Sequence, residues 1–191
     1  MARTADERLA QSVRTLLDAV IRTEVGDDTI AAAEAHVAAA VDLLSEQLMS
    51  GSFGVGGTSD GEPRLLGNVA IGRRNAIAPP LVIERDAAGL VSTEVHLGAA
   101  YEGPAGHVHG GVCALVLDHL LGATAHRAGR PAYTGTLQMR FLRPTPLGRL
   151  RAEAWVEHEQ GRKTYARGRL LTGGRTTVEA QGIFIRPTPG E

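Results

Sequence analysis

The chain has 191 residues, a formal net charge of −1 at pH 7 and one cysteine, Cys113. This length fits one domain with a small addition. The balanced charge gives no strong field for nucleic acid or a membrane surface, and no apolar run approaches the roughly 20 residues that span a bilayer. We therefore expect neither nucleic acid nor membrane as a partner. Asp6 and Glu7 stand where an export signal would be apolar, and a lone cysteine fits a reducing compartment, so the expected location is cytoplasmic.

Residues 4–49 are predicted to form two helices. Thr4 and Glu7 match a capping box, and apolar residues recur at helical spacing in both segments. Asp28 is the expected N-cap of the second helix. The apolar face of this hairpin, residues 1–49, needs a covering surface. The main domain or a second subunit is the expected surface, and a dedicated partner or membrane contact is the alternative.

A Gly/Ser-rich stretch without periodicity, residues 50–62, is the expected linker to a domain over residues 63–188. In that domain the pattern predicts one helix and six strands. The strands are expected at 81–85, 90–97, 132–143, 149–159, 162–171 and 176–186, and the helix at 110–128. Short separators between the strands predict antiparallel neighbours, because a parallel crossover needs a dozen residues or more.

The predicted helix at 110–128 is apolar on every side from Val112 to Leu117, which is typical of a helix surrounded by protein. In the strand at 149–159, small or apolar residues alternate with polar ones, so one face of that strand is predicted to be buried. We therefore predict an α+β fold in which an antiparallel sheet wraps around a central helix, preceded by the helical hairpin.

The run from His107 to Asp118 carries the strongest chemical signal. A turn with paired glycines, Gly110 and Gly111, leads into the apolar helix, and one acid follows inside it. Glycines let a ligand approach the backbone, and a helix N-terminus offers free N–H groups to an oxyanion. A carboxylate among aliphatic side chains must be paired, hydrogen-bonded or protonated. Together these features predict acyl-transfer hydrolysis.

Four segments extend this pattern: Asn75-Ala76-Ile77-Ala78-Pro79-Pro80, the run from Tyr101 to Gly111, Asp118 nine residues after His109, and Phe141-Leu142-Arg143-Pro144-Thr145-Pro146-Leu147-Gly148. With them the chain, from about residue 75 to 186, resembles the hotdog-fold thioesterase superfamily, in particular its phenylacetate-pathway-like acyl-CoA thioesterase branch. The resemblance implies a hotdog fold, a homodimer or dimer of dimers, and hydrolysis of acyl-CoA thioesters without a metal or other cofactor.

The resemblance also implies roles for single residues. The Gly110 amide would bind the thioester oxygen, and Asp118 would act as general base or nucleophile. His109 would order the turn or help to polarise the carbonyl, and Thr134 would position the attacking water. One departure stands at Gly103, where many relatives have an Asn that contacts the carbonyl.

Two further residues are expected to bind substrate. Gly111 belongs to the diglycine turn, and Arg143 lies in the corner that matches the family. Arg143, together with Arg162 and Lys163 at strand ends, can meet the phosphates of coenzyme A. Solvated charge is the simpler interpretation of all three cations.

Helix geometry places a condition on the site. Eight residues separate Gly110 from Asp118, which is about 12 Å of helix rise. Both groups must come within roughly 3 Å of the same reacting atoms. One helix cannot do this, whereas two antiparallel helices across a two-fold axis can. We therefore expect a composite site at a dimer interface, with two sites per dimer.

Structural roles remain open for these residues. Asp118 can be bonded to an Arg or to strand amides, and His109 can simply cap the helix. Strict alternation places Thr134 on the face away from the core, unless a bulge at Gly135 turns it inward.

Two other chemistries also compete. Cys113, one turn after His109, is a possible nucleophile, although a buried cysteine is more often a small hydrophobe. His107, His109, His119 and His126 lack the acids or cysteines that would complete a metal site, so no metal is expected. The alternative functions are a non-catalytic acyl-CoA-binding hotdog protein and a hotdog hydratase or dehydratase.

Overall fold

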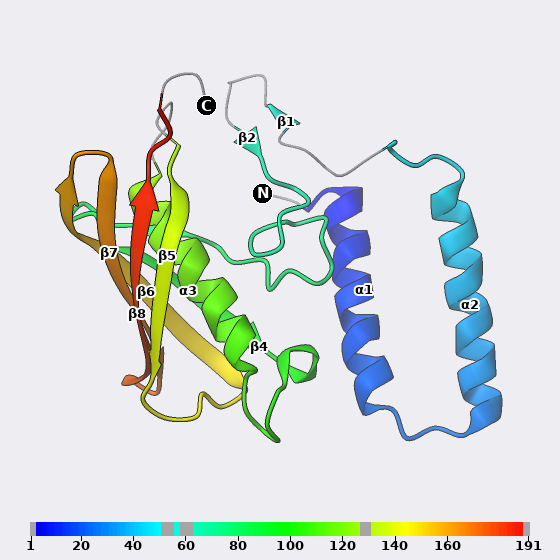
Figure 1. Cartoon of the computed structure of the whole chain (residues 1–191). Coiled ribbons are helices and arrows are strands. Elements are labelled where there is room, and N and C mark those ends of the chain that lie inside the picture. Colours follow the sequence, from blue (N-terminus) through cyan, green and yellow to red (C-terminus); the bar gives the residue numbers. More distant parts are fainter. Residues whose placement is uncertain (1–2, 51–55, 58–62, 127–130, 189–191) are drawn as a thin grey trace. The chain divides into compact units, whose positions relative to one another are not determined.

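The computed structural model describes residues 3–50, 56–57, 63–126 and 131–188. The chain divides into two compact units, one of Met1–Asn68 with Gly72–Ala76 and the other of Val69–Ile71 with Ile77–Glu191. Figure 1 shows the elements of both. Among the described residues, no helix has the length and apolar character needed to cross a membrane.

The first unit contains two helices, α1 (Ala5–Arg22) and α2 (Asp27–Ser45). The predicted capping box is present: Thr4 Oγ1 accepts from the Glu7 amide, and the Thr4 amide donates to Glu7 Oε2. The expected cap at Asp28 is wrong, because Gly26 is the N-cap and makes no side-chain cap bond. Asp28 lies inside the first turn, where its negative charge still favours the helix N-terminus.

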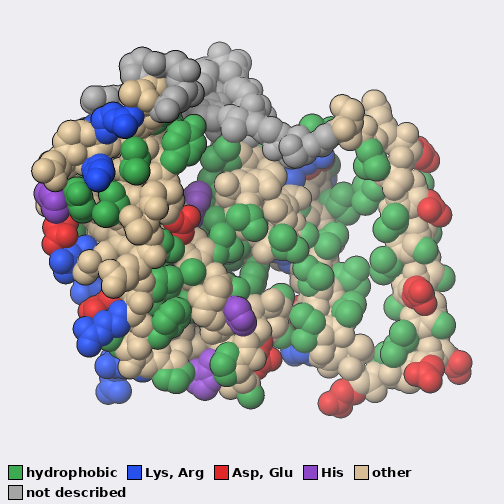
Figure 2. Space-filling view, viewed as in Figure 1, with side chains coloured by type: hydrophobic (Ala, Val, Ile, Leu, Met, Phe, Trp, Pro, Cys, Tyr) green, Lys and Arg blue, Asp and Glu red, His purple; other side chains and the backbone are tan. Residues whose placement is uncertain are grey.

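The apolar stripes of both helices are present and largely exposed. α2 buries none of its residues, and α1 buries only Ala10. The exposed apolar side chains on the two helices are Leu9, Leu16, Val20, Ile21, Ile30, Val37, Val41, Leu43 and Leu44. Along α2 these side chains stand beside acidic ones, and no Lys or Arg occurs in this helix (Figure 2). In the single chain these two helices therefore expose their apolar side chains to solvent.

A polar side chain of α1 bonds the helix to the rest of the first unit. The guanidinium of Arg14 donates to the carbonyls of Gly72 and Asn75 at 3.3 and 2.7 Å. The expected linker over residues 50–62 lies mostly outside the described residues. Strand β1 (Gly56–Gly57) lies within this linker and pairs with β2 (Pro63–Arg64), which follows it.

The second unit is built on a six-stranded antiparallel sheet in the order β3-β4-β6-β7-β8-β5. The short strand β3 is followed by β4, and a 3-10 turn, η1 (Ala99–Tyr101), leads toward the helix. The strands are β3 (Glu84–Arg85), β4 (Val91–Leu97), β5 (Tyr133–Phe141), β6 (Gly148–Gln160), β7 (Lys163–Thr172) and β8 (Arg175–Ile185). Each falls within two or three residues of a predicted strand, because tight turns at glycines mark the ends.

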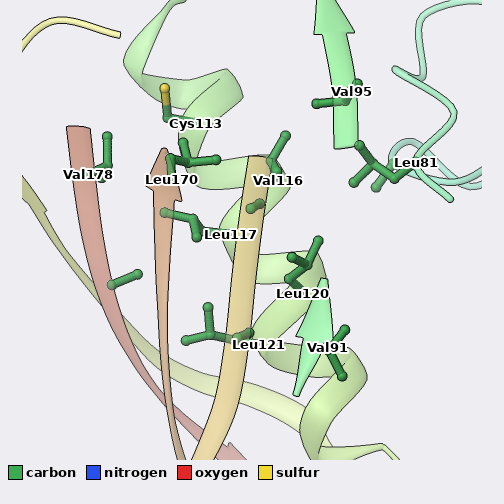
Figure 3. Packing of buried hydrophobic residues seen from close by; sticks show 14 of the residues in the cluster. Leu81, Val91, Val95, Cys113, Val116, Leu117, Leu120, Leu121, Leu170 and Val178 are labelled. Atoms are coloured by element: carbon green, nitrogen blue, oxygen red, sulfur yellow. The ribbon is translucent and has the colours of Figure 1, made fainter. Parts of the chain in front are cut away.

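Helix α3 (Gly110–Ala125) packs on β4, β5, β6, β7 and β8, so the sheet curls around it (Figure 1). Figure 3 shows Leu117 and Leu121 of α3 between the helix and the strands. Glycines on the strands permit this close approach: a Cβ on Gly168 would lie 2.7 Å from Leu121 Cδ1, and one on Gly182 would lie 3.0 Å from Leu121 Cδ2. The arrangement is the hotdog fold that the sequence resemblance implies.

The helix ends earlier than the predicted residue 128. His126 is the C-cap, with an extended backbone, and its amide donates to the carbonyl of Gly122 at 2.8 Å. Residues 127–130, where the helix was expected to end, lie outside the described residues.

Candidate active site

A tight turn between η1 and α3 sets the position of His109. The Glu102 carboxylate accepts from the Gly106 amide at 2.5 Å, and Gly106 has φ = +73°, which favours glycine. The Gly103 amide donates to the carbonyl of His107, and the His109 amide donates to the carbonyl of Tyr101 at 2.9 Å. These bonds fix the backbone that enters α3.

The same turn explains the departure at Gly103. A Cβ at this position would lie 2.8 Å from Cα of His109, closer than real Cβ contacts come. An asparagine here would displace the backbone of His109, so the turn of this chain requires glycine. The carbonyl contact that the family's Asn would supply is therefore absent from this position.

His109 is the N-cap of α3 and uses its ring to do so. Its Nδ1 accepts from the Gly111 amide at 3.0 Å. With Nδ1 as acceptor, the proton of the neutral ring sits on Nε2. The ring thus stabilises the helix terminus, one of the two roles that the sequence left open, and keeps an N–H on its other side.

Gly110 retains a free amide. Among the described residues it has no hydrogen-bond partner for this N–H, whereas Gly111 donates to His109, and the amides of Val112 and Cys113 both donate to the His109 carbonyl. The phenyl ring of Phe141, at the end of β5, faces Gly110: a Cβ there would lie 3.4 Å from Phe141 Cζ. The first turn of α3 therefore offers one unpaired donor beside an aromatic wall.

Asp118 lies two turns further along α3 and is half-buried. The hydroxyl of Thr134, on β5, donates to Asp118 Oδ1 at 3.0 Å. Within the described part of the chain no Lys, Arg or His forms an ion pair with this carboxylate. Among the described residues no Arg holds Asp118, and Thr134 bonds only one of its two carboxylate oxygens.

A bulge at Gly135 brings Thr134 to this face. Thr134 pairs with Phe184 and Thr136 with Ile183, so Gly135 is the extra residue. Phe184 is fully buried, and Thr134 shares its side of the sheet. A Cβ on Gly135 would lie 2.7 Å from Ile185 Cδ1, which explains the glycine. Thr134 therefore faces the helix rather than the side that strict alternation gives.

The remaining candidates occupy different settings. Cys113 is 1% exposed, and burial raises the pKa of its thiol against the weaker effect of the Thr145 hydroxyl. A raised thiol pKa is the opposite of what a nucleophile needs. Burial lowers the pKa of His119, although the charge of the adjacent Asp118 opposes this, so burial favours the uncharged imidazole. The sequence pattern had suggested His119 only as a possible metal ligand.

Arg143 follows β5 at the Gly110 end of the site, is exposed and donates its amide to the Thr177 carbonyl. Arg162 and Lys163 lie at the other end of the sheet. Over the ranges that the structure describes, no three His, Cys, Asp or Glu side chains gather as metal ligands. The groups brought together are thus Thr134 with Asp118, and His109 with Gly110 and Gly111.

Comparisons with known proteins agree with this architecture. The sequence model of the thioesterase superfamily matches residues 105–186. A solved thioesterase superfamily protein, RHA08564, is 32% identical over 96% of this chain and 92% of its own, with a TM-score of 0.85. The chain belongs to the thioesterase superfamily.

Two further solved structures each cover a little more than half of this chain. A phenylacetic acid degradation-related protein from Ralstonia eutropha JMP134 is 25% identical, with a TM-score of 0.53, over 56% of this chain and 85% of its own. The BH2602 protein from Bacillus halodurans, solved with CoA, is 23% identical, with a TM-score of 0.54, over 61% of this chain and 80% of its own.

The His109 cap makes a testable difference to stability. His109→Ala removes the acceptor of the Gly111 amide, and we expect the free energy of unfolding to fall by about 0.5–2 kcal/mol. His109→Asn supplies a side-chain oxygen that caps well, so it should stay near the wild type. Urea denaturation measures both. Equal stability of the alanine and asparagine variants would contradict the capping role.

Proposed function

We propose that this protein is an acyl-CoA thioesterase, which hydrolyses an acyl-CoA to the free acid and coenzyme A. One observation carries the proposal: within the described residues, α3 presents an unpaired amide at Gly110 and, two turns later, a half-buried Asp118 carboxylate that Thr134 holds without a counter-charge. An oxyanion donor and a base or nucleophile are what thioester hydrolysis needs, since the carbonyl is already activated.

The chemistry assigns one task to each group. The Gly110 N–H donates to the thioester oxygen, where negative charge develops as the carbonyl carbon becomes tetrahedral. Asp118 takes the proton of the attacking water while Thr134 fixes its orientation, or it attacks the carbonyl itself and the resulting anhydride is hydrolysed. In both cases the C–S bond breaks, the thiolate of coenzyme A leaves and is protonated, and the acid is released.

The site is proposed to be shared between two protomers. The eight residues between Gly110 and Asp118 correspond to about 12 Å along one helix, too far for both to meet one thioester. Antiparallel α3 helices of two copies bring the Gly110 of one to the Asp118 of the other, which gives two sites per homodimer. The same two-fold arrangement is compatible with a dimer of dimers.

Strand β5 supports this pairing. In the described sheet it is the terminal strand, bonded to β8 along one edge only. Tyr133 and Phe141, at its two ends, are 65% and 56% exposed. An edge strand with exposed aromatic side chains is a surface that a second chain readily covers. Since β5 runs beside α3, a partner on β5 also approaches the site.

The substrate class has further support. The Bacillus halodurans neighbour was solved with CoA, and the Ralstonia eutropha neighbour is a phenylacetic acid degradation-related protein. Coenzyme A thioesters are therefore the proposed substrates. We also propose a cytoplasmic location, for which the buried, unpaired Cys113 is the supporting feature.

Asp118→Asn tests the proposed function. Asparagine keeps the size of the side chain and an oxygen for Thr134 but cannot take a proton, so we expect kcat to fall at least about a hundredfold. Thiol release from a panel of acyl-CoAs measures the rate, and circular dichroism checks the fold. The control is Asp42→Asn, an exposed carboxylate of α2.

The outcomes separate the alternatives. Near-normal hydrolysis by Asp118→Asn removes Asp118 from the mechanism. A wild-type protein that binds acyl-CoA but releases no thiol is a binding protein. One that changes the acyl group without thiol release is a hydratase or dehydratase.

Gly110→Pro tests the oxyanion donor. Gly110 is the first residue of α3, a position where proline fits a helix, and the substitution removes the N–H alone. We expect kcat to fall about 10²–10³-fold. Gly110→Ala keeps the amide and places its Cβ 3.4 Å from Phe141, so it should retain most activity. If the proline and alanine variants have the same kcat, the Gly110 amide is not the donor.

A further inference from the structure

A pocket of about 360 Å³ lies at the end of the sheet, apart from the Asp118 carboxylate. Among the described residues it is lined by Gln160, Arg162, Lys163 and Ile185. They come from the end of β6, the turn after it, the start of β7 and the end of β8. Lys163 is the only lysine of the chain.

The two cations of this pocket lack acidic partners. Within the described residues, no carboxylate lies within 4.0 Å of Arg162 or Lys163, and Arg162 donates only to the Arg186 carbonyl, at 3.4 Å. Several other arginines on or next to the sheet are paired, in the contacts Arg149–Glu94, Arg151–Glu153, Arg167–Glu157, Arg169–Glu153 and Arg186–Glu159, whereas Arg85, Arg140 and Arg175 have no such pair among the described residues. Positive charge is therefore left uncompensated where the surface is hollowed.

The backbone around the pocket is tied together. The Arg186 amide donates to the Arg162 carbonyl at 3.0 Å, and the Arg186 guanidinium donates to the Gly161 carbonyl. Gly161 has φ = +58°, as the tight turn between β6 and β7 requires. The turn that carries Arg162 and Lys163 is thus fixed to the end of β8, which holds the two cations near one another.

Strand register relates this pocket to Asp118. Lys163 pairs with Ile185, and Ile185 pairs with Tyr133, next to Thr134. Two strand spacings separate Lys163 from Tyr133, roughly 10 Å. Thr134 and Phe184 face α3, so Lys163 and Ile185, one residue along, face the other side of the sheet. A ligand that reaches both places must pass the end of β5 in an extended form.

We propose that this pocket binds the phosphate groups at the nucleotide end of coenzyme A, and this proposal rests on the proposed function. An acyl-CoA is long and flexible, with its thioester at one end and three phosphate groups at and near the other. Unpaired Arg and Lys side chains are the usual partners of phosphate, and Gln160 adds an amide donor. The thioester then lies on the helix side of the sheet and the phosphates on the outer side.

The test compares two thioesters with the same acyl group. One is the acyl-CoA, and the other is the N-acetylcysteamine thioester, which lacks the nucleotide. In the double variant Arg162→Gln/Lys163→Gln we expect KM for the acyl-CoA to rise about tenfold or more, because two charge-assisted contacts are lost. The KM for the short thioester should not change. Arg175→Gln, at the opposite end of the β7–β8 hairpin, is the matched control.

Several results would overturn the proposal. One is an unchanged KM for acyl-CoA, and another is an equal rise for both thioesters. A third is a KM rise in Arg143→Gln with none in the double variant, which would place the phosphates at the other end of β5.

Calorimetry separates this proposal from the proposed function. With adenosine 3′,5′-bisphosphate as the probe, the wild type should bind at least about tenfold more tightly than the double variant. We expect this difference in affinity even if the protein hydrolyses neither thioester, a result that would contradict only the proposed function. Inorganic phosphate is the second probe: if it binds as tightly as the bisphosphate, the pocket is a site for the free ion and the nucleotide assignment is wrong.

Discussion

The rigid length of α3 between Gly110 and Asp118 is the constraint on which the rest depends. An α-helix cannot shorten, so a donor at its first residue and a carboxylate two turns later stay about 12 Å apart. The helix packs against five strands, and Leu121 sits where Gly168 and Gly182 leave room, so its position on the sheet is fixed as well. We therefore propose that a second α3 helix, beside the first, completes the thioester site.

Local structure prepares each half of the site separately. At the N-terminus of α3, the His109 ring accepts from the Gly111 amide, and the His109 carbonyl accepts from the amides of Val112 and Cys113. Among the described residues, only the Gly110 amide of this turn remains available for a ligand. At the other half, the bulge at Gly135 turns Thr134 toward the carboxylate of Asp118. Neither half needs the other within one chain. Strand β5 lies beside both halves, with Phe141 near Gly110 and Thr134 bonded to Asp118, and in the described sheet it has a free edge and exposed aromatic side chains.

Much of this structure could be predicted from the sequence, because its signals are local. The apolar run from Val112 to Leu117 indicated a surrounded helix, the short separators indicated antiparallel strands, and Gly135 marked the possible bulge. Two predictions of helix ends were wrong, because neighbouring residues are nearly equal candidates for a cap. Gly26 rather than Asp28 caps α2, and α3 ends at Ala125 rather than at residue 128. The sequence offered Arg162 and Lys163 as candidates for the phosphates of coenzyme A, but it could not show that they lack acidic partners, because that depends on side chains from three strands.

The most direct test of the shared site uses a heterodimer of two inactive variants. Asp118→Asn and Gly110→Pro are co-expressed with different affinity tags, the mixed dimer is purified through both, and thiol release is measured. If each site takes its amide from one protomer and its carboxylate from the other, one site of the mixed dimer is intact and the activity returns to about half that of the wild type. A mixed dimer as inactive as its parents would place both groups of each site in a single protomer and contradict the account.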